Sequence, residues 1–388
     1  MIIGIPKEIM PSERRVAATP ESVKQYVADG HKVLVEKNAG AGALYHDEAY
    51  KAAGAEIVEK AQDLYDQAEL ILKVKEPLFN EETGKHEIDM MHKNQYLITF
   101  IHPAAPVNHE MVKNMAKRGI ISMSIEGVPR ISRAQSMDAL TSMSTCAGYK
   151  GMLMGVSDLE KFVPMMPTAA GLIAPSKIMV IGVGVAGLQA LATAKRLGAV
   201  TYSADIRPAA AEQGVSLGAK NVDLGVDPKL AIGEGGYALA LPDDVLESER
   251  QKLAEILPEM DVVFCSALVP GKLAPTLITE EMVKKMKPGS AIVDIAIDQG
   301  GNCAVTDPGI RSEKHGVILE GIKNIPGRLA TSSTYMYAAN MAALVKYLIK
   351  DNKVSLDTSD EIVAGMLTTL NGEIVHAGAR EAMGMEAK

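Results

Sequence analysis

The segment from Lys177 to Gly187 constrains the fold of this 388-residue chain more than any other. It reads Lys-Ile-Met-Val-Ile-Gly-Val-Gly-Val-Ala-Gly, which predicts a short buried strand running directly into a glycine-rich turn. A helical pattern follows and ends at a glycine, and a second apolar run then ends at Asp205, 23 residues after Gly182. A strand, a glycine turn, a helix and a second strand in this order predict a parallel α/β sheet.

The spacing of the three glycines predicts a dinucleotide-binding turn. Gly182 would permit the tight turn, Gly184 would let the backbone approach a pyrophosphate, and Gly187 would let helix and strand pack closely. An acid at Asp205 accepts hydrogen bonds from the adenine ribose and repels a 2′-phosphate, which favours NAD over NADP. Arg207 points the other way, because a guanidinium binds a 2′-phosphate. The alternative is a glycine turn that serves close packing alone.

Apolar runs alternate with amphipathic stretches along most of the chain, which predicts two doubly wound, Rossmann-like α/β domains with parallel sheets. We expect the first to span residues 1–128, completed by 330–388, and the second to span 129–329. Long helices would link them, with a ligand cleft between them. The expected strands are residues 2–5, 33–35, 70–74, 97–101, 120–123, 178–181, 200–204, 262–265, 291–295 and 317–320, and the expected long helix is 330–350.

Composition excludes several classes of function. The net charge of −8 argues against nucleic acid or an anionic membrane as the main partner. Cys146, Cys265 and Cys303 are far apart in the sequence, so neither a metal site nor a disulfide framework is indicated. The most apolar stretch, residues 169–194, is interrupted by Pro175 and so predicts no membrane span. We therefore expect a soluble, cytoplasmic chain without a metal.

A polar segment, residues 130–138, precedes the glycine turn. It reads Arg-Ile-Ser-Arg-Ala-Gln-Ser-Met-Asp and places two arginines, an amide and an acid within nine residues. Its position at the predicted cleft favours a role in ligand binding. The alternative is a solvated helix entry with Ser132 or Ser136 as its N-cap.

Three segments together carry a family resemblance. PRISRAQSMD, IGVGVAGLQALATAKRLGA and ALVPGKLAPTLITEEMVKKMKPGS resemble the NAD(H)-binding domain of proton-translocating NAD(P) transhydrogenase, which some organisms make as a separate soluble alpha subunit. The resemblance implies that Arg130, Gln135 and Asp138 position NAD(H) for hydride exchange. It also implies that Tyr237, in Gly-Glu-Gly-Gly-Tyr, lies on a mobile lid. The NAD(H)-binding residues would be Arg130, Ile131, Ser132, Gln135, Asp138, Gly182, Val183, Gly184, Val185, Gly187, Asp205, Ile206, Arg207, Gly236, Tyr237, Ala267 and Leu268.

The chain is also similar to alanine dehydrogenase, a soluble enzyme of the same fold. Four residues match that enzyme's pattern: Arg15, Lys75, His102 and Asp298. An arginine and a lysine can bind the carboxylate and carbonyl of a 2-oxo acid, while His102 and Asp298 can transfer protons. We expect the four to converge beside the nicotinamide.

The first hypothesis is therefore the NAD(H)-binding alpha subunit of a membrane transhydrogenase. It would form a homodimer, transfer hydride between NAD(H) and NADP(H), and lie at the inner membrane through NADP(H)-binding and membrane subunits. The first alternative is an NAD-dependent alanine dehydrogenase, which converts L-alanine to pyruvate and ammonia. The second is a non-catalytic NADH-sensing module, which the segment from Gly182 to Asp205 alone would satisfy.

Overall fold

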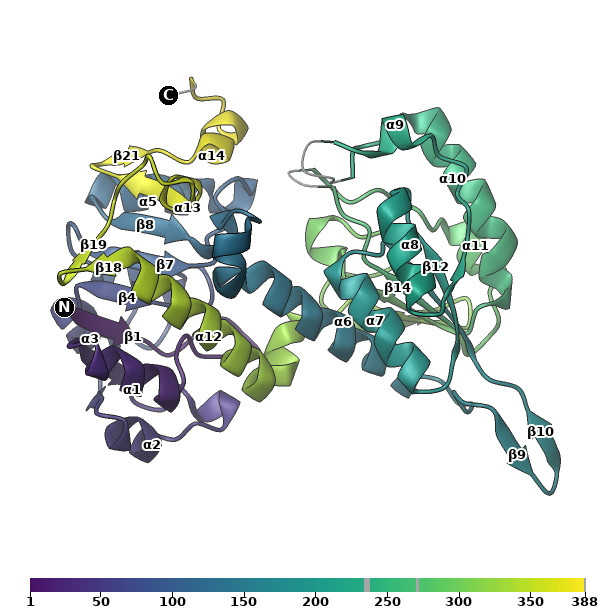
Figure 1. Ribbon diagram of the computed structural model, residues 1–388, viewed down its shortest axis with the longest axis horizontal. Coiled ribbons are helices and arrows are strands. Elements are labelled where there is room, and N and C mark those ends of the chain that lie inside the picture. Colours follow the sequence, from purple (N-terminus) through teal and green to yellow (C-terminus); the bar gives the residue numbers. More distant parts are fainter. Residues whose placement is uncertain (234–237, 270–271, 387–388) are drawn as a thin grey trace. The chain divides into compact units, whose positions relative to one another are not determined.

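A computed structural model describes residues 1–233, 238–269 and 272–386. The chain divides into two compact units (Figure 1), Met1–Met143 with Gly327–Lys388 and Ser144–Pro326. We call them the first and the second unit. Helix α6 (Ala139–Ser157) and the 3₁₀ helix η8 (Ile325–Leu329) cross the boundaries between them.

The first unit contains short strands and helices in alternation. Its elements are β1 (Ile2–Ile5), α1 (Pro20–Ala28), β2 (Lys32–Glu36), η1 (Ala41–Ala43), α2 (Asp47–Ala52), β3 (Glu56–Val58), α3 (Ala61–Gln67), β4 (Leu70–Leu72), β5 (Phe79–Asn80), β6 (Lys85–His86), α4 (Glu87–Met90), β7 (Tyr96–Thr99), η2 (Pro106–Asn108), α5 (His109–Arg118), β8 (Ile121–Ser124), η3 (Ile125–Gly127), η4 (Ser132–Met137), α12 (Ala330–Leu348), β18 (Ile349–Lys350), β19 (Lys353–Val354), α13 (Glu361–Met366), β20 (Leu367–Leu370), β21 (Glu373–Ile374) and α14 (Ala377–Ala382).

The main sheet of the first unit has the order β21-β20-β8-β7-β4-β1-β2-β3. The six strands from β8 to β3 are parallel, and β20 and β21 from the C-terminal part of the chain extend this sheet in antiparallel fashion. All three residues of β4 are buried, as expected for a strand covered on both faces. Helices α1 and α12 pack side by side (Figure 1).

The second unit has the same alternation. Its elements are β9 (Met166–Thr168), β10 (Gly171–Ile173), β11 (Lys177–Ile181), α7 (Val185–Arg196), β12 (Val200–Ala204), α8 (Pro208–Ser216), β13 (Lys220–Asn221), α9 (Pro228–Ala231), α10 (Asp243–Ile256), η6 (Leu257–Glu259), β14 (Val262–Cys265), α11 (Glu280–Val283), β15 (Ala291–Asp294), η7 (Ile297–Gln299), β16 (Arg311–Lys314) and β17 (Val317–Glu320).

The sheet of the second unit has the order β13-β12-β11-β14-β15-β17-β16 and is parallel except for β16. Alternate residues of β11 face opposite sides of it, because side chains of a strand alternate. Met179 and Ile181 belong to one buried cluster, and Ile178 and Val180 belong to the other. The strand order reverses at β11, whose neighbours are β12 and β14. Doubly wound sheets bind ligands at such a switch point.

The predicted fold class, two doubly wound parallel α/β domains, is confirmed. Differences from the expected elements lie at their ends and in short edge strands. The helix after the glycine turn begins at Val185 rather than at Leu188, and α12 ends at Leu348 before a short strand. Strands β3, β13, β16, β20 and β21 were not predicted, because β3, β13 and β21 are very short and the four residues of β16 and of β20 form no continuous apolar run.

Strands β9 and β10 form a hairpin that projects from the second unit (Figure 1). Its residues are mostly exposed, and Leu172 exposes 68% of its surface. None of the helices within the described ranges is both long enough and apolar enough to cross a membrane.

Candidate functional site

The glycine turn after β11 has the geometry that its spacing predicts. Gly182 has φ +84°, a left-handed conformation that an L side chain rarely adopts. A Cβ atom on Gly182 would also lie 2.6 Å from the amide nitrogen of Ala267. A Cβ atom on Gly187 would lie 2.1 Å from the carbonyl oxygen of Gly182, so α7 can approach the turn only without a side chain there.

Gly184 occupies a different environment. It is the N-cap of α7. Among the described residues, no side chain caps this helix, and a Cβ atom on Gly184 would meet no atom within 4 Å. The N-terminus of this 12-residue helix therefore lies behind open space, with its first backbone N–H groups directed outward. The residues fit a bound pyrophosphate, because helix N-termini attract anions through those N–H groups and through the helix dipole.

Asp205, at the carboxyl end of β12, contacts the turn directly. Its carboxylate accepts a hydrogen bond of 2.7 Å from the backbone N–H of Val183. Arg207 donates to both oxygens, through Nε at 2.9 Å and Nη2 at 2.8 Å. This pairing raises the pKa of the Arg207 guanidinium above its ordinary value. Ribose hydroxyls would therefore compete with Arg207 for the Asp205 carboxylate.

The loop after β14 lies against the glycine turn and is fixed by two side chains. The hydroxyl of Ser266 donates a 2.7 Å hydrogen bond to the carbonyl of Gly182. The amide of Asn302 accepts from the N–H of Ala267 at 3.0 Å and donates to its carbonyl at 2.9 Å. This loop carries Ala267 and Leu268, so both are held at the same sheet edge as the glycine turn.

Asp294 in turn holds the loop that carries Asn302. It is fully buried at the end of β15 and accepts from the N–H groups of Ala296, Asn302 and Cys303 at 3.1, 2.7 and 2.9 Å. Burial raises the pKa of Asp294 to about 6, against the opposing effect of these hydrogen bonds. Neither Asp294 nor Asn302 was predicted from the sequence. The only signals there were a polar residue at the end of a buried strand and an asparagine after two glycines.

A third residue that was not predicted, Glu249, lies on the core-facing side of α10. Leu253, one turn further along, belongs to the core, and Glu249 itself is 4% exposed. No hydrogen bond or ion pair joins it to another described residue. Burial raises the pKa of Glu249 to about 7, and repulsion from Asp205 adds to the shift. A second acid therefore lies close enough to Asp205 to interact with it.

The polar segment 130–138 belongs to the first unit and packs on α12. Ala134 and Met137 are buried, while Arg130 and Gln135 are exposed. Residues 132–137 form the 3₁₀ helix η4, and the side-chain amide of Asn340 donates a 2.8 Å hydrogen bond to the carbonyl of Ser136. The segment thus presents Arg130 and Gln135 to solvent from an ordered backbone.

Asp138 caps the helix that follows. Its two oxygens accept from the backbone N–H of Thr141 at 2.8 Å and from the Thr141 hydroxyl at 2.7 Å, which is the geometry of an N-cap on α6. The alternative prediction that Ser132 or Ser136 is a helix N-cap is wrong. Both serines lie within η4, whose N-cap position is Ile131, and α6 is capped by Asp138.

Arg15 is buried in the first unit and already paired. Its Nε and Nη2 donate to the two oxygens of Glu13 at 2.8 and 2.6 Å, and its Nη1 lies 3.0 Å from the sulfur of Met143. The Nε–Nη2 edge of the Arg15 guanidinium, which could bind a substrate carboxylate, thus already binds the carboxylate of Glu13.

Lys75 is half-buried, and its backbone N–H lies 3.3 Å from a carboxylate oxygen of Glu8. Glu8 is also 3.5 Å from the ammonium of Lys73, which forms a 2.7 Å pair with Glu87. Burial raises the pKa of Glu8 to about 7, although Lys73 opposes the shift. Lys75 therefore lies beside a buried charge network that was not predicted from the sequence.

His102 has φ +49°, a strained conformation for a residue with a side chain. Its ring stacks on that of Phe100, with centroids 5.8 Å apart. Its Nδ1 lies 3.8 Å from a carboxylate oxygen of Glu76, and its Nε2 lies 3.8 Å from one of Glu126. Phe100 also contacts Tyr337, which interacts electrostatically with Arg15 and with Glu126. Phe100 thus contacts the rings of both His102 and Tyr337, and Arg15 lies near Tyr337 in the same unit.

Asp298 lies in the second unit, on η7, where it is exposed and 3.8 Å from Lys323. The convergence of Arg15, Lys75, His102 and Asp298 stays a prediction. Gly236 and Tyr237, the predicted lid, lie outside the described residues. Within the described part of the chain, no three histidine, cysteine, aspartate or glutamate side chains are placed to hold a metal ion.

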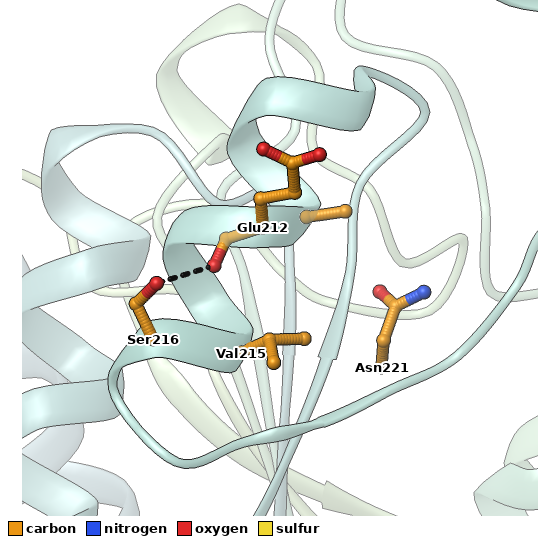
Figure 2. Close-up of a pocket in the computed structure, with 5 residues that line it drawn as sticks. Glu212, Val215, Ser216 and Asn221 are labelled. Carbon is orange, nitrogen blue, oxygen red and sulfur yellow. Dashed lines mark hydrogen bonds between the residues drawn. The ribbon is translucent and has the colours of Figure 1, made fainter.

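A pocket of about 400 Å³ opens at the end of α8 (Figure 2). It is lined by Ala211, Glu212, Val215, Ser216 and Asn221. The hydroxyl of Ser216 donates to the carbonyl of Glu212 at 2.9 Å, and the lining contains no cationic side chain. It therefore provides no counter-charge for a phosphate, and it contains none of the residues predicted from the sequence.

Comparison with known families divides the chain near residue 150, close to the first boundary between the two units, but residues 327–377 of the C-terminal match belong to the first unit. The N-terminal domain of the alanine dehydrogenase/PNT family matches residues 4–147, and the C-terminal domain of that family matches residues 151–377. The chain belongs to the alanine dehydrogenase/PNT family. The glycine turn and Asp205 lie within the C-terminal match, and Arg130 lies within the N-terminal one.

Within this family, the chain is similar to two kinds of protein. It is 43% identical to the first part of a divided NAD(P) transhydrogenase subunit alpha from Rhodospirillum rubrum, over 97% of this chain and 98% of that one. It is 39% identical to an NAD(P) transhydrogenase subunit alpha from Cereibacter sphaeroides, over 96% of this chain and 71% of that one. An alanine dehydrogenase from Methanococcus maripaludis is more distant, at 34% identity over 98% of this chain and 96% of that one.

Solved structures show the same two kinds of relative. A transhydrogenase structure from Sinorhizobium meliloti matches with a TM-score of 0.84 and 38% identity, covering 97% of this chain and all of that one. An L-alanine dehydrogenase structure matches with a TM-score of 0.82 and 29% identity, covering 99% of each chain. The family therefore shares this fold, and by sequence identity this chain lies nearer to the transhydrogenase subunits.

Proposed function

We propose that this chain is the NAD(H)-binding alpha subunit of a proton-translocating NAD(P) transhydrogenase. The observation that carries the proposal is the open N-terminus of α7 behind Gly184, with Asp205 hydrogen-bonded to the same turn through Val183. This arrangement fits the pyrophosphate and the adenine ribose of a dinucleotide. The identity to transhydrogenase alpha subunits from several bacteria supports the choice of reaction.

Each group of residues has a separate role in this proposal. The backbone N–H groups at the start of α7 hold the pyrophosphate, and Asp205 accepts hydrogen bonds from the ribose. Ala267 and Leu268 line the sheet edge beside the turn, while Arg130 and Gln135 orient the nicotinamide. Bound NAD(H) itself supplies or accepts the hydride. The protein contributes orientation, because transfer requires the reacting atoms to be held at close distance.

The proposal includes partners. The chain forms a homodimer and works with an NADP(H)-binding subunit and a membrane subunit, which place it at the cytoplasmic face of the inner membrane. Hydride exchange between NAD(H) and NADP(H) is then coupled to proton translocation through the membrane subunit. The names of the similar proteins, subunits of a larger enzyme, support this assembly.

The test mixes the chain with an NADP(H)-binding transhydrogenase subunit and follows hydride transfer from NADH to an NADP analogue with a shifted absorbance. Gln135→Asn and Arg130→Ala should slow transfer more than they weaken NADH binding, since a misplacement of about 1 Å can cost roughly 100-fold in rate. Lys346→Met, on the exposed side of α12, is the control. Wild-type rates in both variants would remove Arg130 and Gln135 from the proposal, and no transfer in the wild type would overturn it.

One observation favours a second function, NAD-dependent alanine dehydrogenase. The residues that match that enzyme in the first unit, Arg15, Lys75 and His102, are all present, and His102 has the strained backbone typical of functional positions. The pair between Arg15 and Glu13 weighs against it, because a 2-oxo acid would have to displace Glu13. Pyruvate- and ammonia-dependent oxidation of NADH that is lost in His102→Ala and in Asp298→Asn would replace the first proposal by this one.

A further inference from the structure

Arg133 ties the polar segment 130–138 to two helices that follow much later in the chain. Its Nη1 donates a 2.6 Å hydrogen bond to the hydroxyl of Tyr347 on α12. Its Nη2 lies 3.1 Å from a carboxylate oxygen of Asp360 and 3.0 Å from one of Glu361, at the N-terminus of α13. One exposed guanidinium thus joins η4 to partners more than 200 residues away in the sequence.

Isolated ion pairs on a protein surface contribute little, because water screens them and two flexible side chains must be ordered. Two of the three partners of Arg133, Asp360 and Tyr347, are held by other hydrogen bonds as well. Asp360 caps α13 by accepting the N–H of Ile362 at 2.9 Å, and its second oxygen accepts the hydroxyl of Tyr347. Arg133 therefore binds to a fixed set of acceptors, which favours a defined position for η4 over a mobile one.

The segment is attached at three points along its length. Arg133 contacts α12 and α13, the carbonyl of Ser136 accepts from Asn340, and Asp138 caps α6 through Thr141. Gln135 lies between the first two of these points. Arg133 is the residue of the segment that joins it to α13, while Ala134 is buried and η4 packs on α12.

We propose that Arg133 is a positioning residue, whose bonds to Tyr347, Asp360 and Glu361 hold the segment in the conformation that presents Arg130 and Gln135 to the nicotinamide. This inference rests on the proposed hydride transfer. Arg133 contacts neither cofactor nor substrate in this role. It raises the fraction of molecules in which the segment is ready to react, and the observed rate scales with that fraction.

The first measurement needs no activity. Hydrogen exchange of the peptide covering residues 130–138 reports on the amides of Ala134 and Asp138, which donate to Ile131 and to Gln135. Arg133→Met should exchange faster than the wild type, and Glu361→Gln should have a smaller effect. Arg118→Met is the matched control, because Arg118 is an exposed arginine of the same unit that pairs with Asp89 on a different element.

The second measurement is hydride transfer with the NADP(H)-binding subunit, alongside NADH affinity by calorimetry. Arg133→Met should slow transfer by about 3- to 10-fold, with NADH affinity changed less than twofold, since the competent population falls while the nucleotide site stays intact. Arg133→Lys should recover part of the rate, because lysine keeps the charge but loses the planar fork. Asp360→Asn, which keeps the acceptor for the helix cap, should resemble Glu361→Gln.

The outcomes separate the two proposals. Faster exchange and slower transfer in Arg133→Met, with neither in Arg118→Met, support the role of Arg133. Unchanged exchange, or faster exchange at a wild-type transfer rate, overturns it. If the wild type transfers no hydride while Arg133→Met still exchanges faster, the proposed function fails and the role of Arg133 in transfer fails with it, although its role in ordering the segment stands.

Discussion

Arg207 covers the carboxylate of Asp205 through two hydrogen bonds of 2.9 and 2.8 Å. The carboxylate also accepts the N–H of Val183, so Asp205 helps to shape the turn. Its side chain is only 4% exposed, against 24% for Arg207. The acid that would choose between NAD and NADP is thus shielded by a cation that could favour the opposite choice. The preference between NAD and NADP therefore depends on whether Asp205 or Arg207 contacts the adenine ribose.

We expect NADH to bind more tightly than NADPH, and Asp205→Ala to weaken NADH by on the order of 1.5–3 kcal/mol, the value of hydrogen bonds to a charged group. Arg207→Ala should keep or raise NADH affinity, because it frees the carboxylate for the ribose hydroxyls, and it should weaken NADPH further. Calorimetric titration of both nucleotides measures these effects. A wild-type preference for NADPH, or a loss of NADH affinity in Arg207→Ala, would assign the ribose contact to Arg207 instead.

Substitution of two glycines of the turn should affect two different properties, stability for Gly187 and NADH affinity for Gly184. Gly187→Ala should lower the free energy of unfolding by about 1–3 kcal/mol or more, since its Cβ would lie 2.1 Å from the carbonyl of Gly182. Gly184→Ala should leave stability nearly unchanged, because its Cβ meets open space, yet weaken NADH by at least about tenfold where the pyrophosphate would lie. Urea unfolding and calorimetry separate the two. Wild-type NADH affinity in Gly184→Ala would remove the pyrophosphate from this helix N-terminus.

Asn302 should matter for NADH although we expect no contact with the nucleotide. Asn302→Ala removes its hydrogen bonds to Ala267 and to the carbonyl of Pro275, which leaves buried backbone groups unpaired at a cost of about 1–3 kcal/mol. The loop beside Gly182 would loosen, so NADH affinity should fall as well. Asn221→Ala, at an exposed asparagine elsewhere in the second unit, is the control. If Asn302→Ala lowers stability but leaves NADH affinity unchanged, the loop that carries Ala267 does not contribute to NADH binding.

Glu249 should make stability depend on pH. Its pKa is about 7 in the folded chain, so it keeps a proton that the unfolded chain releases above its ordinary pKa of 4.5. The free energy of unfolding that it contributes therefore falls as pH rises from about 4.5 to about 7. Glu249→Gln should be more stable than the wild type above this window by up to roughly 3 kcal/mol, with the difference vanishing below it.

Unfolding by urea between about pH 4 and about pH 8 gives this difference directly. The matched control is Glu255→Gln, an exposed acid on the same helix α10. It should follow the wild type across the whole range. A constant difference between Glu249→Gln and the wild type at every pH would mean that the pKa of Glu249 is the same in the folded and unfolded chains, contrary to its burial.

The doubly wound fold and the glycine turn could be predicted from the sequence because the signals are local. A buried strand such as Leu70–Leu72 appears as an apolar run, and Gly182, Gly184 and Gly187 lie within six residues on one strand–helix connection. Short edge strands such as Lys220–Asn221 gave no such signal, because two residues carry no periodicity.

Only the tertiary structure decided which side chains meet. The pairs of Asn302 with Ala267 and of Arg133 with Asp360 join residues 35 and 227 positions apart, and no local pattern encodes such distances. Arg15 illustrates the same limit at short range. Its match to the alanine dehydrogenase pattern implies a substrate ligand, and the structure adds that it is buried against Glu13, because a buried guanidinium needs an acid within hydrogen-bonding distance. Spacing along the chain thus determined the backbone of the glycine turn, and packing determined which charged side chains near it are already paired.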